Sequence, residues 1–237
     1  DLVRSRGLGD VYKRQLCKQE KVDFLLAVGG GSVIDSAKAI GYGIANECDV
    51  WDLYSKKSVP TGCLPVGAVL TIAAAGSEMS DSSVITNDTT WQKRGLSTDY
   101  ARCRFAVLNP ELTYTLPAYQ TACGCVDILM HTLERYFSDV DDLIFTDEIA
   151  LGLIKSVIIA GKRVLKDPYD YNARASLMIA SSFSHNGLTG LGSKLYFTVH
   201  KLEHIISGTY DRVAHGAGLS ILFLAWARSV SYTHLRA

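Results

Sequence analysis

The stretch KVDFLLAVGGGSVIDSAKAIGYGIAN, residues 21–46, decides the fold of the first part of the chain. Its apolar run VDFLLAV is typical of a strand in a parallel sheet that is covered on both faces. Three glycines, Gly29 to Gly31, break the run, and Ser32 with Asp35 forms the S-x-x-D pattern of a helix start. Backbone N–H groups and the helix dipole favour an anion at such a turn, so it predicts a phosphate site. A tight, capped strand–helix turn is the alternative, and the turn alone leaves both open.

More strand signals follow this unit. The segment LPVGAVLTI, residues 64–72, predicts a second buried strand, and the small-residue loop AAAGSEMS comes after it. Two β-rich segments, SSVIT at 82–86 and RFAVLN at 104–109, lie on either side of a polar stretch at 87–99 that is typical of a turn. We therefore expect residues 16–112 to form an α/β domain.

The pattern changes to helical spacing after NPELTYTLP, residues 109–117, in which Pro110 and Pro117 mark a boundary. Downstream, apolar residues recur at helical intervals in four long blocks. These blocks are VDILMHTLERYF (126–137), TDEIALGLIKSVIIAGKRVL (146–165), NARASLMIASSFSH (172–185) and KLYFTVHKLEHIIS (194–207). We expect residues 113–230 to form an all-α domain.

Histidines and one aspartate stand out in the helical part. Asp127 and His131 are four residues apart, so they share one helix face, and a buried carboxylate there needs a partner or a cation. The segment HKLEHIISGTYDRVAHG adds His200, His204 and His215. Imidazole and carboxylate together suit Zn²⁺ or Fe²⁺ and do not suit Ca²⁺ or Mg²⁺. The sequence therefore predicts a mononuclear metal site, although Asp127 and His131 alone would also fit a satisfied core pair.

Composition narrows the functional class. Lys and Arg together number 24, as do Asp and Glu, which argues against a nucleic-acid or anionic-membrane partner. No apolar run approaches the roughly 18 residues of a membrane-spanning helix. Six scattered cysteines without a C-x-x-C pair indicate reduced thiols and a cytoplasmic location. Residues 1–15 and 231–237 fit no amphipathic pattern continuous with their neighbours, so we expect them to be non-native ends of an internal fragment.

Taken together, several motifs resemble one family. These are AVGGGSVIDSAKAI, LTIAAAGSEMSDSSVIT, VLNPELTYTLP, GCVDILMHTLERYF and HKLEHIISGTYDRVAHGAGL. In order and spacing, from about Cys17 to Trp226, they resemble the iron-containing (group III) alcohol dehydrogenases, in particular the butanol dehydrogenase-like NAD(P)H-dependent aldehyde reductases. The resemblance implies an incomplete α/β dinucleotide-binding domain followed by an incomplete all-α metal-binding domain. It also implies hydride transfer between NAD or NADP and a primary alcohol or aldehyde, such as butanol or butyraldehyde, and a homodimer at full length.

The resemblance assigns roles to individual residues. The metal ligands would be Asp127, His131, His200 and His215, and His204 would lie near the substrate and relay a proton. Fe²⁺ is the ion that the family is named for, and Zn²⁺, Ni²⁺ or Co²⁺ suit the same ligands. The dinucleotide would be held by Gly30, Gly31, Ser32, Asp35, Thr71, Ser77 and Lys93. The spacing from His204 to His215 is one residue longer than in many relatives, and we expect a turn or bulge to absorb it.

Three alternatives compete with this interpretation. HKLEH, residues 200–204, fits the H-x-x-E-H pattern of a zinc metallopeptidase in which Glu203 is the base. That reading leaves Asp127, His131 and His215 unexplained, and it fails if Asp127 reaches the metal. The chain would also fit a catalytically inactive fragment of a reductase. A glycerol dehydrogenase or dehydroquinate synthase relative would share the architecture.

Overall fold

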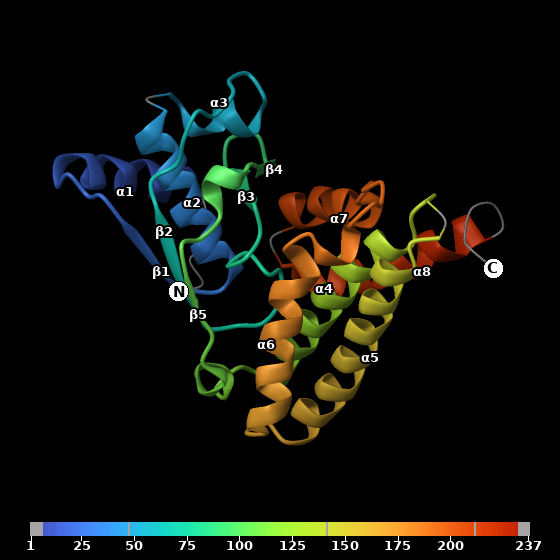
Figure 1. Ribbon diagram of the computed structural model, residues 1–237. Coiled ribbons are helices and arrows are strands. Elements are labelled where there is room, and N and C mark those ends of the chain that lie inside the picture. Colours follow the sequence, from blue (N-terminus) through green and yellow to red (C-terminus); the bar gives the residue numbers. More distant parts are fainter. Residues whose placement is uncertain (1–6, 47, 141, 211, 232–237) are drawn as a thin grey trace. The chain divides into compact units, whose positions relative to one another are not determined.

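The computed structural model describes residues 7–46, 48–140, 142–210 and 212–231. The chain forms two compact units, the first spanning Asp1–Thr71 and Ser77–Leu108, and the second spanning Ile72–Gly76 and Asn109–Ala237 (Figure 1). The first unit is α/β and the second is all-α, which confirms the predicted fold class. Of the expected non-native ends, residues 1–6 and 232–237 lie outside the described residues.

A parallel sheet organises the first unit. Its strand order is β1-β2-β5, with β1 at Leu25–Gly29, β2 at Val66–Leu70 and β5 at Ala106–Val107. Helix α2, Gly31–Ala45, follows β1 after the glycine turn and packs against it, as a βα unit requires. A Cβ on Gly29 would lie 2.6 Å from Val33 Cγ2. Glycine therefore lets α2 begin directly beside the end of β1.

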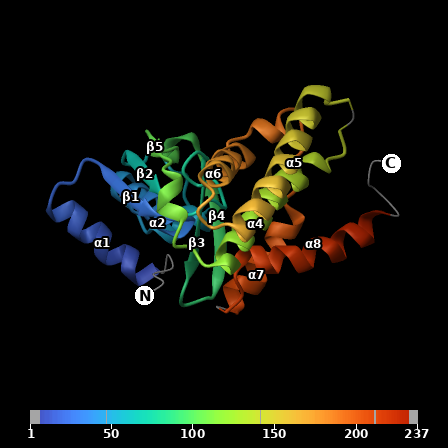
Figure 2. The ribbon, with the colours of Figure 1, turned by 90° about the horizontal axis from the view of Figure 1, so that it is seen from below.

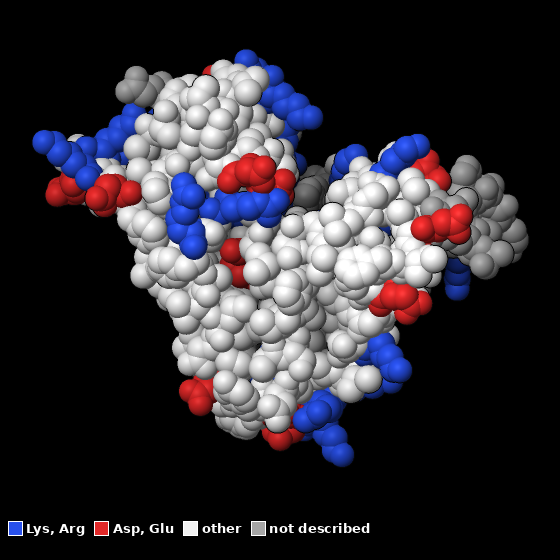
Figure 3. Space-filling model, viewed as in Figure 1, with Lys and Arg blue, Asp and Glu red and all other residues white. Residues whose placement is uncertain are grey.

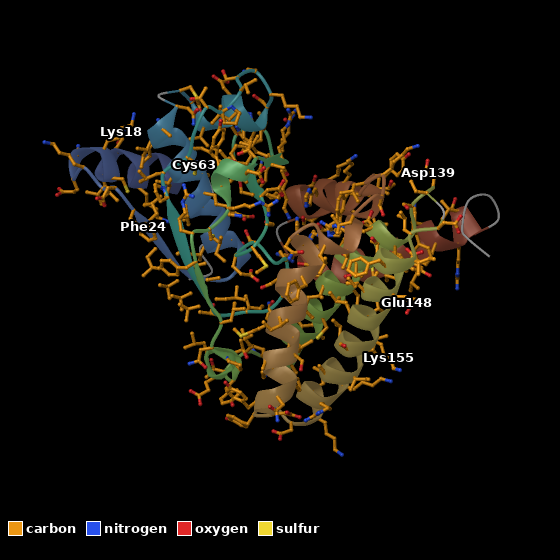
Figure 4. The ribbon with its side chains drawn as sticks, viewed as in Figure 1. Lys18, Phe24, Cys63, Asp139, Glu148 and Lys155 are labelled. Atoms are coloured by element: carbon orange, nitrogen blue, oxygen red, sulfur yellow. The ribbon has the colours of Figure 1, made fainter. Side chains whose placement is uncertain are left out.

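One face of β1 is exposed among the described residues. Leu26 and Val28 are 56% and 58% exposed, whereas Ala27 between them is buried. The expectation of a strand covered on both faces is therefore wrong for the part of the chain that the structure describes. The apolar run that suggested it reflects one buried and one uncovered face, and Phe24, which begins the exposed side, is labelled in Figure 4.

The polar stretch 87–99 is more regular than expected. It contains strand β4, Gln92–Ser97, which pairs antiparallel with β3, Ser82–Asn87. The Asn87 side chain accepts hydrogen bonds from the N–H groups of Thr89 (2.9 Å) and Thr90 (3.0 Å) and so forms the turn between the strands. The prediction of a turn throughout was wrong because β4 carries little apolar signal. Its regularity comes from pairing with β3 and from Leu96, which packs against the core.

The start of the chain is also more ordered than expected. Helix α1, Gly7–Gln19, includes residues 7–15, which the sequence pattern had assigned to a non-native end. It packs against α2, and Arg14 Nη1 donates a hydrogen bond of 2.8 Å to the Cys48 carbonyl. Residues 7–15 therefore belong to a helix that packs in the first unit, and their non-native origin stays a prediction. The rest of the first unit includes the short helix α3, Val50–Tyr54, capped by Asp49, which accepts from Trp51 N–H at 2.9 Å.

Five α-helices lie in the described part of the second unit. They are α4 (Ala118–Tyr136), α5 (Ile144–Lys166), α6 (Tyr171–His185), α7 (Thr198–Thr209) and α8 (His215–Ser231). Helices α4, α5 and α6 pack side by side, as Figures 1 and 2 both show. Short 3-10 helices cover Asp99–Ala101 in the first unit and Pro110–Thr113 and Leu188–Gly190 in the second. No described helix has the length and apolar character needed to cross a bilayer.

Helix α4 belongs to two cores at once. Ile128 packs with Val157 of α5 and Leu177 of α6, while Met130 packs with Val199 of α7 and Leu219 of α8. All of these side chains are at most 6% exposed. The two cores hold α4 between α5 and α6 on one side and α7 and α8 on another. Side chains of α4 that lie between these cores are therefore held in place by four neighbouring helices.

Replacing Leu177 by alanine tests the first of these cores. Leu177 is 3% exposed, so Leu177→Ala should lower the free energy of unfolding by roughly 2–5 kcal/mol through lost burial and a cavity. The matched control is Leu151→Ala on α5, where the leucine is 44% exposed and the loss should stay below about 1 kcal/mol. Urea unfolding followed by circular dichroism at 222 nm gives both values. Equal losses at the two positions would contradict the packing described.

Candidate metal centre and dinucleotide-binding turn

Helix α4 carries the first two predicted ligands. Asp127 and His131 lie one helical turn apart on the same face and are 4% and 5% exposed. Side chains four residues apart are neighbours on a helix surface, so the local sequence alone brings Asp127 and His131 together. Burial by the neighbouring helices then removes both side chains from water.

Helices α7 and α8 bring the other two. His200 is the third residue of α7 and His215 the first residue of α8. Between the helices, Val213 N–H donates to the Tyr210 carbonyl at 3.0 Å. The additional residue expected in this segment stays a prediction. A Cβ on Gly216 would lie 2.1 Å from the Cys123 carbonyl oxygen of α4. The glycine after His215 therefore allows α8 to start directly against α4.

The Nε2 atoms of all three histidines lie close to Asp127 Oδ1. Donor atoms of Asp127, His131 and His200 lie within 4.8 Å of one another, and His215 forms a second such group with Glu203 and His204. Asp127 Oδ1 lies 3.4 Å from His131 Nε2, 3.6 Å from His200 Nε2 and 3.7 Å from His215 Nε2. These distances are too long for good hydrogen bonds. They are close to the separation of about 3.4 Å between ligand atoms around a tetrahedral metal with bonds of about 2.1 Å.

Unsatisfied atoms support the same conclusion. Asp127 Oδ1 and His200 Nε2 are buried without a hydrogen-bond partner among the described residues. A buried carboxylate oxygen and imidazole nitrogen in this state are costly unless a cation binds them. The residues present therefore fit a divalent metal, and the three histidines with one carboxylate suit Zn²⁺ or Fe²⁺.

Glu134 orients His200 and was missed in the sequence. Its Oε1 accepts from Val199 N–H at 2.7 Å and its Oε2 from His200 N–H at 3.2 Å, and Oε2 also contacts His200 Nδ1. One carboxylate thus caps the start of α7 and fixes the ring whose Nε2 faces Asp127. A signal was available, because Glu134 follows Asp127 by seven residues and His131 by three, on the same face of the helix.

Glu203 does the same for His215. It is fully buried, and its Oε2 contacts His215 Nδ1 and accepts from Ser207 Oγ at 3.1 Å. Both carboxylates therefore hold Nδ1 of a histidine and leave its Nε2 for a metal, an arrangement common around metal sites. The metallopeptidase pattern would instead need Glu203 as a base beside a zinc held by His200 and His204. Glu203 instead contacts His215 and Ser207, and Asp127 Oδ1 lies 3.6 Å from His200 Nε2. Both observations argue against a metallopeptidase site.

His185 and His204 complete the surroundings. His185, the last residue of α6, has its Nδ1 3.1 Å from His131 Nε2, a contact that a metal on this nitrogen would replace. The sequence offered no role for His185, because only the fold brings α6 beside α4. His204 lies one turn after His200, half-buried, with its ring centre 5.4 Å from that of His215.

Electrostatic interactions around Asp127 and His131 favour an ionised carboxylate and a neutral imidazole. Burial raises the pKa of Asp127, but the nearby His215 and His200 outweigh it and leave the pKa below its usual value. Burial, with His185 and His200 beside it, holds the pKa of His131 well below its usual value. Asp127 is thus ionised and His131 neutral, the forms that bind a metal.

The pKa of His200 is raised, whereas the pKa of His185 is lowered. Burial alone would lower the pKa of His200, but Asp127 and Glu134 outweigh it and raise the pKa to about 8. Burial and the positive Arg135 lower the pKa of His185 to about 3. The negative charge around His200 therefore attracts a cation, which is a proton when no metal is bound.

The predicted dinucleotide residues all lie in the first unit. Gly30 is the N-cap of α2 and Gly31 its first residue, and Thr71 N–H donates to the Gly29 carbonyl at 3.1 Å. The glycine turn and Thr71 thus share the carboxyl edge of the parallel strands, where ligands of α/β sheets bind. Ser32 is exposed in the first turn of α2, and Lys93 lies on β4 opposite Thr86.

The S-x-x-D pattern does not form the helix start that it suggested. The N-cap residue is Gly30, which has no side chain to cap the helix, so neither Ser32 nor Asp35 is the N-cap. Asp35 instead accepts from Ser77 Oγ and from Val84 N–H, the latter at 3.0 Å. The capping prediction was wrong because Asp35 has tertiary partners that a local pattern does not reveal. Ser77 and Asp35, both predicted to serve the dinucleotide, are brought into direct contact.

Replacing Glu134 by glutamine tests the support of the metal centre. Glutamine keeps an oxygen for the N–H groups of α7 but loses the charge beside His200, so the affinity for Zn²⁺ should fall roughly 10- to 100-fold. Glu148→Gln on α5 is the matched control, because this glutamate is exposed and labelled in Figure 4. Competition with a chromogenic chelator measures both affinities. Unchanged affinity in Glu134→Gln would refute the orienting role.

Known proteins match most of the chain. The model of the family "Iron-containing alcohol dehydrogenase" matches residues 13–110, and that of "Fe-containing alcohol dehydrogenase family, C-terminal" matches residues 121–234. NADH-dependent butanol dehydrogenase A of Clostridium acetobutylicum is 42% identical over 212 residues, which are 90% of this chain and 54% of that protein. The NADPH-dependent aldehyde reductase YqhD of Escherichia coli is 36% identical over 215 residues, covering 89% of this chain and 55% of its own length.

Solved structures agree with these matches. The crystal structure of NADH-dependent butanol dehydrogenase A from Thermotoga maritima superposes with a TM-score of 0.91 at 39% identity, covering 94% of this chain and 56% of that one. The chain spans about half the length of the curated relatives it matches. Both family models match in chain order, one in the α/β part and one in the helical part. The chain belongs to the iron-containing alcohol dehydrogenase family.

Proposed function

We propose that the protein is a metal-dependent NAD(P)(H) alcohol dehydrogenase or aldehyde reductase acting on a primary alcohol or aldehyde such as butanol or butyraldehyde. The observation that carries this proposal is the convergence of Asp127, His131, His200 and His215 through Oδ1 and three Nε2 atoms. Relatives named butanol dehydrogenase and aldehyde reductase, at 42% and 36% identity, support the reaction class.

The four converging side chains would hold one divalent ion. When bound, the metal would polarise the oxygen of the aldehyde or alcohol as a Lewis acid, and the nicotinamide would supply or accept the hydride. Fe²⁺ is proposed from the family name, and Zn²⁺ and Ni²⁺ suit the same donors. Glu134 and Glu203 would keep the His200 and His215 rings turned toward the metal.

His204 is proposed as the residue that moves the proton. It is half-buried, lies one turn after His200 and has its ring 5.4 Å from that of His215. An imidazole can hold a proton at Nδ1 or Nε2 and exchange it with the substrate oxygen or a water. Its neighbours His200 and His215 have their Nδ1 atoms engaged by carboxylates, and their Nε2 atoms are proposed to bind the metal.

The glycine turn is proposed to bind the dinucleotide. Backbone N–H groups of Gly30, Gly31 and Ser32 open α2, where the helix dipole favours phosphate. Asp35, Thr71, Ser77 and Lys93 would serve neighbouring groups of the cofactor. The names of the relatives include both NADH- and NADPH-dependent enzymes, so either nucleotide is proposed.

The partners proposed are a small alcohol or aldehyde and, for the full-length protein, a second copy in a homodimer. Nucleic acid and membrane are not proposed as partners. On the face seen in Figure 3, basic and acidic side chains are interspersed, which gives no extended field of one sign to attract a polyanion. The cytoplasmic location stays a prediction from the unpaired cysteines.

Oxidation of NADH and NADPH with butyraldehyde tests the proposed function. The natural gene product that carries these residues is purified without oxygen, loaded with Fe²⁺ or Zn²⁺ and compared with His200→Ala. Loss of a ligand should reduce kcat/KM at least ~100-fold, because the polarising ion is lost or misplaced. The rate with each nucleotide also identifies the cofactor.

Lys201→Ala is the control for this experiment, because Lys201 is the exposed neighbour of His200 on α7. Its activity should equal that of the unchanged protein. A folded gene product that binds metal and oxidises neither nucleotide with any of the ions would sink the proposal. It would bring the catalytically inactive alternative forward.

A further inference from the structure

Lys38 is a fully buried cation in the first unit. It lies in the middle of α2 with 0% of its surface exposed. Its Nζ donates three hydrogen bonds, to the carbonyl oxygens of Ser77 (2.7 Å), Ser80 (3.0 Å) and Ser82 (2.7 Å). An ammonium group has three N–H donors, so these carbonyls use all of them.

Asp35 binds the same segment from the preceding turn of α2. Its carboxylate accepts from Ser77 Oγ and from Val84 N–H. Because residues three apart lie on one face of a helix, Asp35 and Lys38 point to the same side. Together they make five hydrogen bonds to the segment Ser77–Val84, two of them to Ser77 itself.

Packing alone does not explain a lysine at this position. Burial of an ammonium is costly unless hydrogen bonds and an opposite charge compensate it. Burial lowers the pKa of Lys38, and the attraction of Asp35 partly restores it. An apolar side chain would fill the space at lower cost but could bind none of the three carbonyls.

The segment Ser77–Val84 is bound to α2 close to the glycine turn. Asp35 and Lys38 follow the glycine turn by one and two helical turns, and Ser77 begins the segment that they bind. The segment is thereby fixed to the helix whose N-terminus opens at Gly30 and Gly31. Its conformation depends on polar bonds, because half of its residues are serines and Ser77, Ser80 and Ser83 are at most 4% exposed.

We propose that Lys38 is a positioning residue that holds the segment Ser77–Val84 against α2 in the conformation that receives the dinucleotide. Lys38 does not touch the dinucleotide, because its three donors are all engaged by backbone carbonyls. This inference rests on the proposed function for its ligand. The clamp itself is a property of the first unit.

Two substitutions test the role of Lys38. Lys38→Met keeps the length of the side chain without its donors, and Lys38→Arg keeps the charge in a planar shape that cannot reach three carbonyls in the same way. Lys57→Met is the control, because 70% of the Lys57 side chain is exposed and its Nζ forms a surface ion pair with Asp52 at 3.4 Å. Should Lys38→Met fail to fold, Lys38→Arg carries the test.

The first measurement is amide hydrogen exchange by mass spectrometry. Peptides covering Ser77–Val84 should lose protection in both Lys38 variants, while peptides of β1 and α4 keep theirs. Unchanged protection of this segment would overturn the clamp. Loss of protection over the whole first unit in both variants would also overturn it, because Lys38 would then support the fold in general.

The second measurement is the affinity for NADH and NADPH, with Zn²⁺ affinity as a reference in the same samples. Both Lys38 variants should bind the nucleotide at least roughly tenfold more weakly, with Zn²⁺ affinity within about twofold of the unchanged protein. A local loss of protection with unchanged nucleotide affinity would overturn the positioning role alone. Absence of nucleotide binding in the unchanged protein would instead overturn the proposed function, together with the dinucleotide part of this inference.

Discussion

The second unit depends on what surrounds one buried carboxylate. Asp127 is 4% exposed and has three imidazole nitrogens within 3.7 Å of its Oδ1, which accepts no hydrogen bond from the described residues. Such an arrangement is costly without a cation, and the pKa of His200, raised to about 8, shows that the site draws positive charge. The helices around it must therefore be held firmly enough to keep these groups together.

Helix α4 keeps these groups in position because it packs in two hydrophobic cores. Ile128 and Met130, which flank the face of Asp127 and His131, each anchor α4 in a different set of helices. Glu134 on the same face caps α7, so the residue that fixes the start of that helix also orients His200. Glu203 links α7 to His215 in the same manner. Stability and ligand geometry therefore rest on the same few contacts.

The first unit solves a related problem with backbone groups. Its glycine turn leaves N–H groups at the start of α2, and the face of α2 formed by Asp35 and Lys38 binds the segment after β2. In both units, a charged side chain on a helix fixes the start or course of a neighbouring segment. A carboxylate serves where N–H groups need an acceptor, and an ammonium serves where carbonyls need a donor.

The sequence by itself determined the α/β part, the helical part and the pair Asp127–His131, because strand runs, helical periodicity and i, i+4 spacing are local. The histidines of residues 200–216 also led it to predict a mononuclear metal site with this pair, and the resemblance then specified His200 and His215 as the further ligands. Strand β4, the exposed face of β1, the helical residues 7–15 and the partners of Asp35 escaped it. Those features, like the contacts of Glu134, His185 and Lys38, were decided by the tertiary structure, because they depend on which segments distant in the chain pack together.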